Sequence, residues 1–174
     1  MRRVMQMAKR NLLNGQSKKG PVKVFVSGCY DVLHGGHVEF FRGAKVLGQN
    51  VAKASGRNGA HLTVSFASDA VLKKYKGRES AIPMNHKRRL LEELRSVDKV
   101  VSSSNPKEPI LDFEKHFLRM RPDILVVTSD DKNVAIKQAL CDKVGAKLVV
   151  LPKSLSGRLG PISTTQIRER ILKN

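Results

Sequence analysis

The chain has 174 residues, of which 40% are hydrophobic, and a formal net charge of +18 at pH 7. This length fits one domain of ordinary size, and the hydrophobic content argues against wholesale disorder because it is enough for a buried core. No apolar run approaches the ~20 residues of a membrane span, and two cysteines without a CxxC spacing disfavour a structural disulfide or a zinc site.

The first segment, residues 1–20, carries six Lys or Arg side chains and no acidic residue. We expect a basic, flexible N-terminal arm over residues 1–20 and a folded domain over residues 21–174. The excess charge predicts an acidic partner, for which nucleic acid, an anionic membrane surface and a polyphosphate substrate are alternatives; a solvated basic surface is another. The arm lacks the apolar core of a secretory signal, so a cytoplasmic protein is expected, with an organellar presequence as the alternative.

Five short apolar runs rich in β-branched residues predict strands at Lys23–Ser27, Leu62–Ala67, Lys99–Ser102, Ile124–Thr128 and Lys147–Leu151. Apolar residues at helical spacing, together with helix start and stop signals, predict helices at Glu39–Leu47, Met84–Val97, Leu111–Arg119, Asn133–Val144 and about Thr164–Leu172. Two polar, glycine-containing segments, Gln49–Ala60 and Ser154–Pro161, are expected to be loops. The alternation predicts an α/β fold: a Rossmann-like, doubly wound parallel sheet in a single domain. Ligands bind such sheets at the carboxyl ends of the strands.

The first strand is followed by Gly28, Cys29, Tyr30 and Asp31, and then by His34, Gly35, Gly36 and His37. Glycines let phosphate oxygens approach the backbone, and the start of the next helix favours an anion. His34 and His37 can point at one spot and stabilise charge that develops on a phosphoryl group. The HxxH spacing also suggests a metal pair, but weakly, because no third ligand lies nearby at a suitable spacing.

Charged side chains also follow the second and fourth strands. Asp69 precedes a basic segment, Lys73–Arg78, whose cations would neutralise a triphosphate; a solvated surface turn is the alternative, and we prefer it for Lys73. Asp130 and Asp131 suit a ribose hydroxyl or a substrate amine, or the capping of the next helix.

The last strand is followed by two cations, Lys153 and Arg158, and then by Ile162-Ser163-Thr164-Thr165. Hydroxyl groups at a helix start, with an arginine shortly before them, predict a second anion site. Ser163 is equally compatible with a role as the helix N-cap alone.

Together these motifs resemble the cytidylyltransferase-like, or HxGH, nucleotidyltransferase family. Gly28–His37 matches the opening signature of that family, and Ile162–Thr165 matches its serine/threonine signature. Ala67–Asp69, Lys76–Gly77 and Val97–Val100 fall where relatives have SD or TD, KG and VDxV. The resemblance spans about Val22–Ile171. Against it, Gln49–Ala60 is longer than the usual link into the second strand, and is a candidate oligomer or acceptor contact.

The resemblance implies an enzyme that joins a nucleoside triphosphate, CTP or ATP with Mg²⁺, to a phosphorylated alcohol or sugar and releases pyrophosphate. It implies catalytic roles for His34 and His37 at the phosphates, for Lys76 between nucleotide and acceptor, and for Arg158 near the leaving group. The nucleotide-binding residues that it implies are Gly28, Cys29, Tyr30, Asp31, Gly36, Asp69, Lys87, Thr128, Asp130, Ile162, Ser163, Thr164 and Thr165. Lys87 stands where relatives commonly carry arginine, and the neighbouring Arg88 and Arg89 are alternatives for that position.

The subfamily stays open. The first signature and the spacing of Arg158 to Ser163 favour enzymes that make CDP-alcohols, whereas the size and motif order also resemble heptose 1-phosphate adenylyltransferases, and flavin-adenylating relatives share the core. A homodimer is expected. The competing hypothesis is a non-catalytic module that binds nucleic acid through the basic arm, but only 5% of the residues are aromatic, which leaves little for base stacking.

Overall fold

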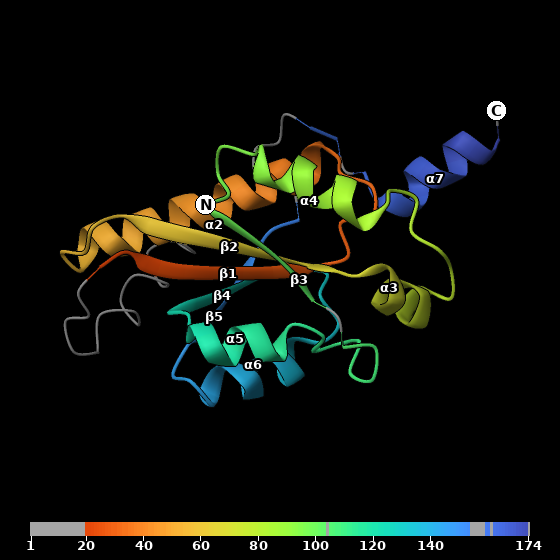
Figure 1. The fold of residues 1–174 in the computed structure, drawn as a ribbon. Coiled ribbons are helices and arrows are strands. Elements are labelled where there is room, and N and C mark those ends of the chain that lie inside the picture. Colours follow the sequence, from red (N-terminus) through yellow and green to blue (C-terminus); the bar gives the residue numbers. More distant parts are fainter. Residues whose placement is uncertain (1–19, 104, 154–158, 161, 174) are drawn as a thin grey trace.

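A five-stranded parallel sheet in the order β3-β2-β1-β4-β5 forms the centre of the fold (Figure 1). The computed structural model describes residues 20–103, 105–153, 159–160 and 162–173. The strands are β1 (Val22–Gly28), β2 (Ala60–Ala67), β3 (Lys99–Ser103), β4 (Ile124–Thr128) and β5 (Lys147–Leu151). The chain order reverses between β1 and β4, the position where open α/β sheets bind ligands. The predicted Rossmann-like, doubly wound sheet is therefore confirmed.

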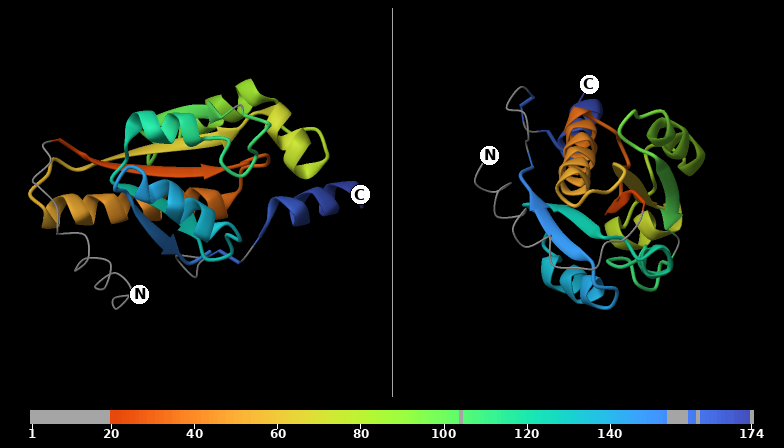
Figure 2. Two further views of the ribbon diagram at one scale, coloured as in Figure 1. Left: turned by 90° about the horizontal axis from the view of Figure 1, so that it is seen from below. Right: turned by 90° about the vertical axis from the view of Figure 1, so that its left-hand side faces the viewer.

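Helices cover both faces of this sheet. They are α2 (Gly35–Ala54), α3 (Asp69–Lys76), α4 (Met84–Glu92), α5 (Glu114–Met120), α6 (Val134–Asp142) and α7 (Thr164–Leu172). Helices α2 and α4 lie on one face and α5 and α6 on the other, and the end-on view in Figure 2 separates the two layers. Helix α7 projects from one end of the molecule (Figure 1). Among the described residues, no helix is long and apolar enough to cross a membrane.

Alternate residues of β1 build two separate cores. Val24 and Val26 are fully or almost fully buried in the cluster beneath α2, whereas Phe25 points to the opposite face and joins the cluster of α5 and α6. There its ring meets Phe117 edge-on, with centroids 5.4 Å apart, and packs against Phe113. Because both faces of a parallel sheet are buried, its strands are continuous apolar runs, which is why the sequence revealed them.

The predicted loop at Gln49–Ala60 is wrong over its first half, because α2 continues to Ala54, and only residues 55–59 form the turn that leads into β2. Val51 and Ala52 are buried against the sheet, one helical turn beyond the apolar residues that signalled the helix. Gly48 lies on the same face, where a Cβ atom would come within 2.5 Å of Val24. Glycine therefore lets the helix approach β1 closely, and residues 49–54 are part of the sheet-covering layer and not of an inserted loop.

Helix α3 was not among the predicted elements, although local signals mark both of its ends. Ser68 caps its first turn by accepting a hydrogen bond from the Val71 amide, and Gly77 ends it in the left-handed conformation. The basic segment is thus a short helix and not a turn, and Lys73 is exposed on it, as expected.

Two predicted helices are shorter in the structure. Helix α4 ends at Glu92, because residues 93–97 form tight turns that lead into β3, and Leu91 is buried while Leu90 is exposed. Helix α5 begins at Glu114, after turns that start at Glu108. The predicted arm, apart from Gly20, and most of the predicted loop at Ser154–Pro161 lie outside the described residues.

Candidate active site

A cavity of about 430 Å³ opens at the carboxyl ends of β1 and β4, between the first turns of α2 and α7. Predicted site residues that line it are Gly28, Cys29, Tyr30, Asp31, His34, Gly36, His37, Lys76, Thr128, Asp130, Ile162, Ser163, Thr164 and Thr165. Two other predicted site residues, Asp69 and Lys87, do not line this cavity. The remaining one, Arg158, is outside the described residues. The fold therefore gathers the two separated sequence motifs around one space.

The two histidines of the first motif stack against each other, with ring centroids 3.9 Å apart. Their Nδ1 atoms are buried and have no hydrogen-bond partner among the described residues. Burial, with a smaller effect of the neighbouring His34, lowers the pKa of His37 to about 3. Burial and the charge of Lys153 also lower the pKa of His34. At neutral pH both imidazoles are therefore uncharged, and each carries one N–H donor.

The glycines of this loop lie directly against the rings of His34 and Tyr30. A Cβ atom on Gly36 would lie 3.0 Å from the His34 ring, and one on Gly28 would lie 2.7 Å from the Tyr30 ring. Tyr30 has a positive φ of 48°, and its ring packs edge-on against His37 at 5.2 Å. Tyr30 thus holds His37 in place, and Gly28 and Gly36 leave room for this arrangement.

Asp31 fastens three segments together although its side chain is only 2% exposed. It accepts hydrogen bonds from the Arg78 guanidinium at 2.6 Å, the Ser80 hydroxyl at 2.8 Å and the Ala81 amide at 2.6 Å, and Arg168 of α7 lies 3.5 Å away. Burial by itself would raise the pKa of Asp31, but the donors from Arg78, Ser80 and Ala81 together hold it below its usual value. The ionised carboxylate therefore joins the histidine loop to the segment after α3 and to α7.

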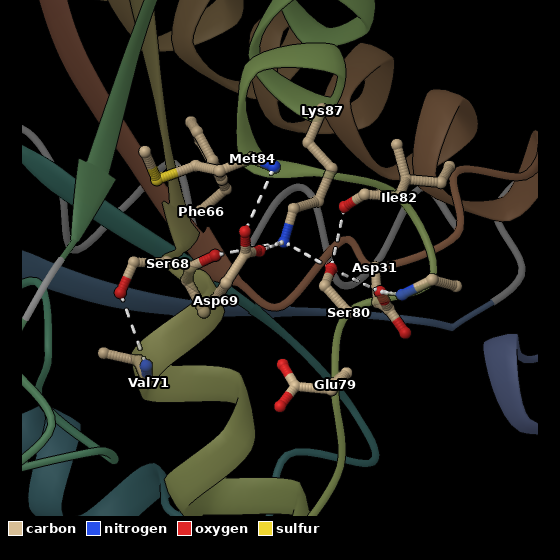
Figure 3. A network of polar contacts seen from close by, with 12 residues as sticks. Asp31, Phe66, Ser68, Asp69, Val71, Glu79, Ser80, Ile82, Met84 and Lys87 are labelled. Carbon is tan, nitrogen blue, oxygen red and sulfur yellow. Dashed lines mark hydrogen bonds and ion pairs between the residues drawn. The ribbon is translucent and has the colours of Figure 1, made fainter.

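Lys87 and Asp69 form a network beside the cavity, drawn in Figure 3. The Lys87 side chain is completely buried, and its Nζ donates to Asp69 Oδ1 at 3.1 Å and to Ser80 Oγ at 2.9 Å. Ser80 in turn contacts Asp31, while Asp69 Oδ2 accepts from the Met84 amide at 3.3 Å. In this structure Lys87 and Asp69 thus contact each other and the segment between α3 and α4.

The second motif forms the start of α7. Ser163 and Gln166 make a reciprocal capping box, in which the Ser163 hydroxyl accepts from the Gln166 amide at 3.2 Å and Gln166 Oε1 accepts from the Ser163 amide at 2.8 Å. The N-cap interpretation of Ser163 is confirmed. Thr164 donates to the carbonyl of Val32 at 3.3 Å and so attaches this helix start to the histidine loop.

Two carboxylates follow β4, and each is paired with a lysine. Asp130 lies 2.7 Å from Lys153, whose hydrogen bond lowers the pKa of Asp130. Asp131 lies 2.6 Å from Lys137 and accepts a hydrogen bond from the Asn133 amide at 2.8 Å, in the turn that leads into α6. Both also face the cavity.

A second cavity, of about 420 Å³, adjoins the first. The two share Ser27, Gly28, Cys29, Lys76, Asp130 and Asp131 as lining residues. The far wall comes from the segment before α5 and from α6, and includes Pro109, Ile110, Asp112, Phe113, Asn133 and Lys137. Sequence reasoning missed this wall, because no motif marks residues 109–113. A search after every strand would have reached Asp112, which follows β3.

Comparison with known proteins gives consistent matches. The model of the cytidylyltransferase-like family matches residues 25–170. The FAD synthases of Korarchaeum cryptofilum and Pyrococcus horikoshii are 29% and 30% identical, over 87% and 86% of this chain and 92% of their own lengths. The bifunctional protein HldE of Syntrophotalea carbinolica is 31% identical over 94% of this chain, which spans only 29% of that protein.

Among solved structures, the lipopolysaccharide core biosynthesis protein from Thermoplasma volcanium GSS1 has a TM-score of 0.58 and 25% identity. The match covers 78% of this chain and 98% of that one.

Proposed function

The chain belongs to the cytidylyltransferase-like family and is a nucleotidylyltransferase, and we propose that it joins a nucleoside triphosphate to a phosphorylated small molecule with release of pyrophosphate. The observation that carries this proposal is the stacked, uncharged pair His34 and His37, which faces the start of α7 across one cavity. Two helix starts and two N–H donors converge there on a space suited to a polyphosphate.

In the proposed reaction, an oxygen of the acceptor's phosphate attacks the α-phosphorus of the triphosphate in line. The new P–O bond forms while the bond from the α-phosphorus to the bridging oxygen breaks, and pyrophosphate leaves with that electron pair. Such a transfer needs no covalent intermediate with the protein, so positioning and charge neutralisation supply the catalysis.

Magnesium enters as part of the substrate, bound to the triphosphate. Within the described part of the chain, no group of three His, Cys, Asp or Glu side chains is placed to hold a metal ion. We therefore assign most of the ion's ligands to phosphate oxygens and water.

The two motifs take different parts of the triphosphate. His34 and His37 would donate to oxygens of the α-phosphate and of the leaving group, where negative charge grows in the transition state. Ser163, Thr164 and Thr165 would hold the β- and γ-phosphates at the start of α7. Arg158 remains the proposed cation for the leaving pyrophosphate.

Lys76 lines both cavities and would bridge the two substrates. In-line attack requires the acceptor to approach from the side opposite the leaving group. The leaving group would lie against α7, which lines only the first cavity, and the second cavity opens beyond Cys29 and Lys76. We therefore assign the first cavity to the nucleotide and the second to the acceptor.

For the nucleotide, we place ATP ahead of CTP. Both FAD synthase relatives match over 92% of their length, and FAD contains an adenylyl group. CTP, which the first motif and the Arg158 spacing favour, is the second candidate. A homodimer, a cytoplasmic location and nucleic-acid binding by residues 1–20 remain predictions from the sequence.

A thermal-shift screen of the purified chain against ATP, CTP, GTP and UTP, each with Mg²⁺, tests the nucleotide assignment. A ligand that binds only the folded state raises its stability by mass action, by about 2.7 kcal/mol at 100 times the Kd. We expect ATP to give the largest shift; a larger shift with CTP would reverse the order, and no shift with any triphosphate would contradict the proposed function.

A further inference from the structure

Leu159 is an exposed apolar side chain in the wall of the first cavity. Three other apolar side chains of this wall, Phe40, Leu72 and Val127, are at most 7% exposed, whereas Leu159 is 46% exposed. A single exposed leucine on a protein surface is ordinary, but one inside a ligand cavity gives contact area to the ligand. Leu159 therefore offers a surface to a ligand group that has an apolar face.

The position of Leu159 depends on Gly35, the variable residue of the HxGH motif. A Cβ atom on Gly35 would lie 2.7 Å from Leu159 Cδ1, so the leucine packs against bare backbone at the start of α2. Gly35 does not have a positive φ, so this contact uses its missing side chain and not a special backbone conformation. The two motifs thus meet through an apolar contact as well as through the hydrogen bond from Thr164 to Val32.

The polar groups of the first cavity leave one region of its wall for a nucleobase. In the proposed reaction, the two histidines and the start of α7 hold the phosphates, and Asp130 is a candidate for the ribose hydroxyls. A base stacks on aromatic or apolar side chains, and Leu159 with the half-buried Ile162 supplies such a surface. A Cβ atom on Gly160 would meet no atom within 4 Å among the described residues, so the wall beside Leu159 borders open space.

Building on the proposed function, we propose that the nucleobase of the triphosphate stacks on Leu159, and that Gly35 controls this contact by leaving room for the leucine. The leucine contacts the face of the base and makes no hydrogen bond to its edge. Such a contact strengthens with the apolar area that it covers. It therefore favours a purine over a pyrimidine, in agreement with placing ATP ahead of CTP.

Isothermal titration calorimetry of the full chain tests this contact with the Mg²⁺ complexes of ATP, CTP and inorganic tripolyphosphate. Tripolyphosphate supplies the three phosphates without a base or a ribose. We expect Leu159→Ala to weaken ATP binding by about 10-fold and CTP binding by less, because the larger ring loses more contact area. Binding of tripolyphosphate should stay unchanged.

Gly35→Ala tests the same contact from its other side. Among the described residues, only Leu159 has atoms within 4 Å of the added Cβ, and the nearest is the end of its side chain. The leucine can therefore turn to another rotamer while the fold remains. We expect a loss of ATP affinity similar to that of Leu159→Ala. In the double variant the added methyl group has no leucine to displace, so its ATP affinity should match that of Leu159→Ala within about 2-fold.

Leu90→Ala is the matched control for the truncated leucine. Leu90 is also 46% exposed, but it lies on α4 and lines neither cavity. The same substitution there should leave the affinity for all three ligands unchanged. The comparison separates a lost contact inside the cavity from a general effect of shortening an exposed leucine.

Unchanged ATP affinity in a folded Leu159→Ala protein would overturn the inference, as would an equal loss for ATP and tripolyphosphate or a larger loss for CTP than for ATP. Additive losses in the double variant would overturn the assignment of Gly35. Failure of the proposed function is distinguishable, because the wild-type chain would then bind no triphosphate and release no pyrophosphate, a result that would overturn both.

Discussion

The buried ammonium group of Lys87 donates a hydrogen bond to the Ser80 hydroxyl at 2.9 Å, and that hydroxyl lies 2.8 Å from Asp31 Oδ1 (Figure 3). Ser80 has a single proton to donate, and Lys87 occupies one of its acceptor sites. Helix α4 is thereby connected to the histidine loop through one serine.

The substitution Lys87→Met removes the donor shared by Asp69 and Ser80 while keeping most of the buried volume. We expect a loss of about 1–3 kcal/mol in the free energy of unfolding, because these groups lose a charged partner. Lys87→Arg keeps a cation at this position and should lose less. Urea denaturation of the three proteins measures the effect, and a Met variant as stable as wild type would contradict this role.

Asp31→Asn tests the carboxylate that pairs with Arg78 and Arg168. Because the donors around Asp31 hold its folded-state pKa below the usual value, ionised Asp31 stabilises the fold above the ordinary aspartate pKa of about 3.9. This contribution is lost as pH falls through the lower folded-state pKa. We expect the variant to be less stable by about 2 kcal/mol at neutral pH, with the gap closing in acid. Urea unfolding at several pH values checks this, and a gap that did not change with pH would count against it.

The lowered pKa of His37 also predicts that stability depends on pH, but for the opposite reason to Asp31, because burial favours the uncharged form of the ring. Here the uncharged form is favoured by folding, so stability is complete above the ordinary histidine pKa of about 6.5 and declines as pH falls toward about 3. NMR titration should show no protonation of the His37 ring near neutral pH. A His37 midpoint near the ordinary histidine pKa of about 6.5 would be inconsistent with the burial described.

Gly48→Ala tests the close approach of α2 to β1. The added Cβ would lie 2.5 Å from Val24 Cγ2, and overpacking of about 1–3 kcal/mol should exceed the ~1 kcal/mol gained in helix propensity. Gly160→Ala, where a Cβ meets no atom within 4 Å among the described residues, is the control and should be close to neutral. Thermal unfolding compares the two, and an unchanged Gly48→Ala protein would show that the helix can move away at no cost.

The strands and the two motifs were predictable from the sequence for a physical reason. Because both faces of the sheet are buried, each strand is a continuous run of apolar residues. The strand order places the ligand-binding edge at the carboxyl ends of β1 and β4. His34, His37 and Ser163 follow such strands directly or through one loop, so their convergence could be inferred before the structure.

The remaining features depend on contacts that no local pattern encodes. The second half of α2 presents Gln49 and Asn50 beside Gly48, a combination that resembles a loop although the opposite face is buried. The far cavity wall combines Asp112 and Lys137 from segments that only the sheet order brings together. Similarly, the role of Lys87 in holding Ser80 follows from tertiary packing and not from its place in a motif.

The most direct test of the central claim is the rate of pyrophosphate release by His37→Ala, measured with saturating Mg²⁺–ATP and a phosphorylated acceptor that the wild-type chain turns over. Loss of a donor that stabilises charge in the transition state typically lowers kcat about 10²–10³-fold. We expect a loss of that size with the folded state intact by thermal unfolding, while His86→Ala on the exposed face of α4 keeps wild-type turnover. Full turnover by a folded His37→Ala protein would contradict the proposed role of the stacked histidines.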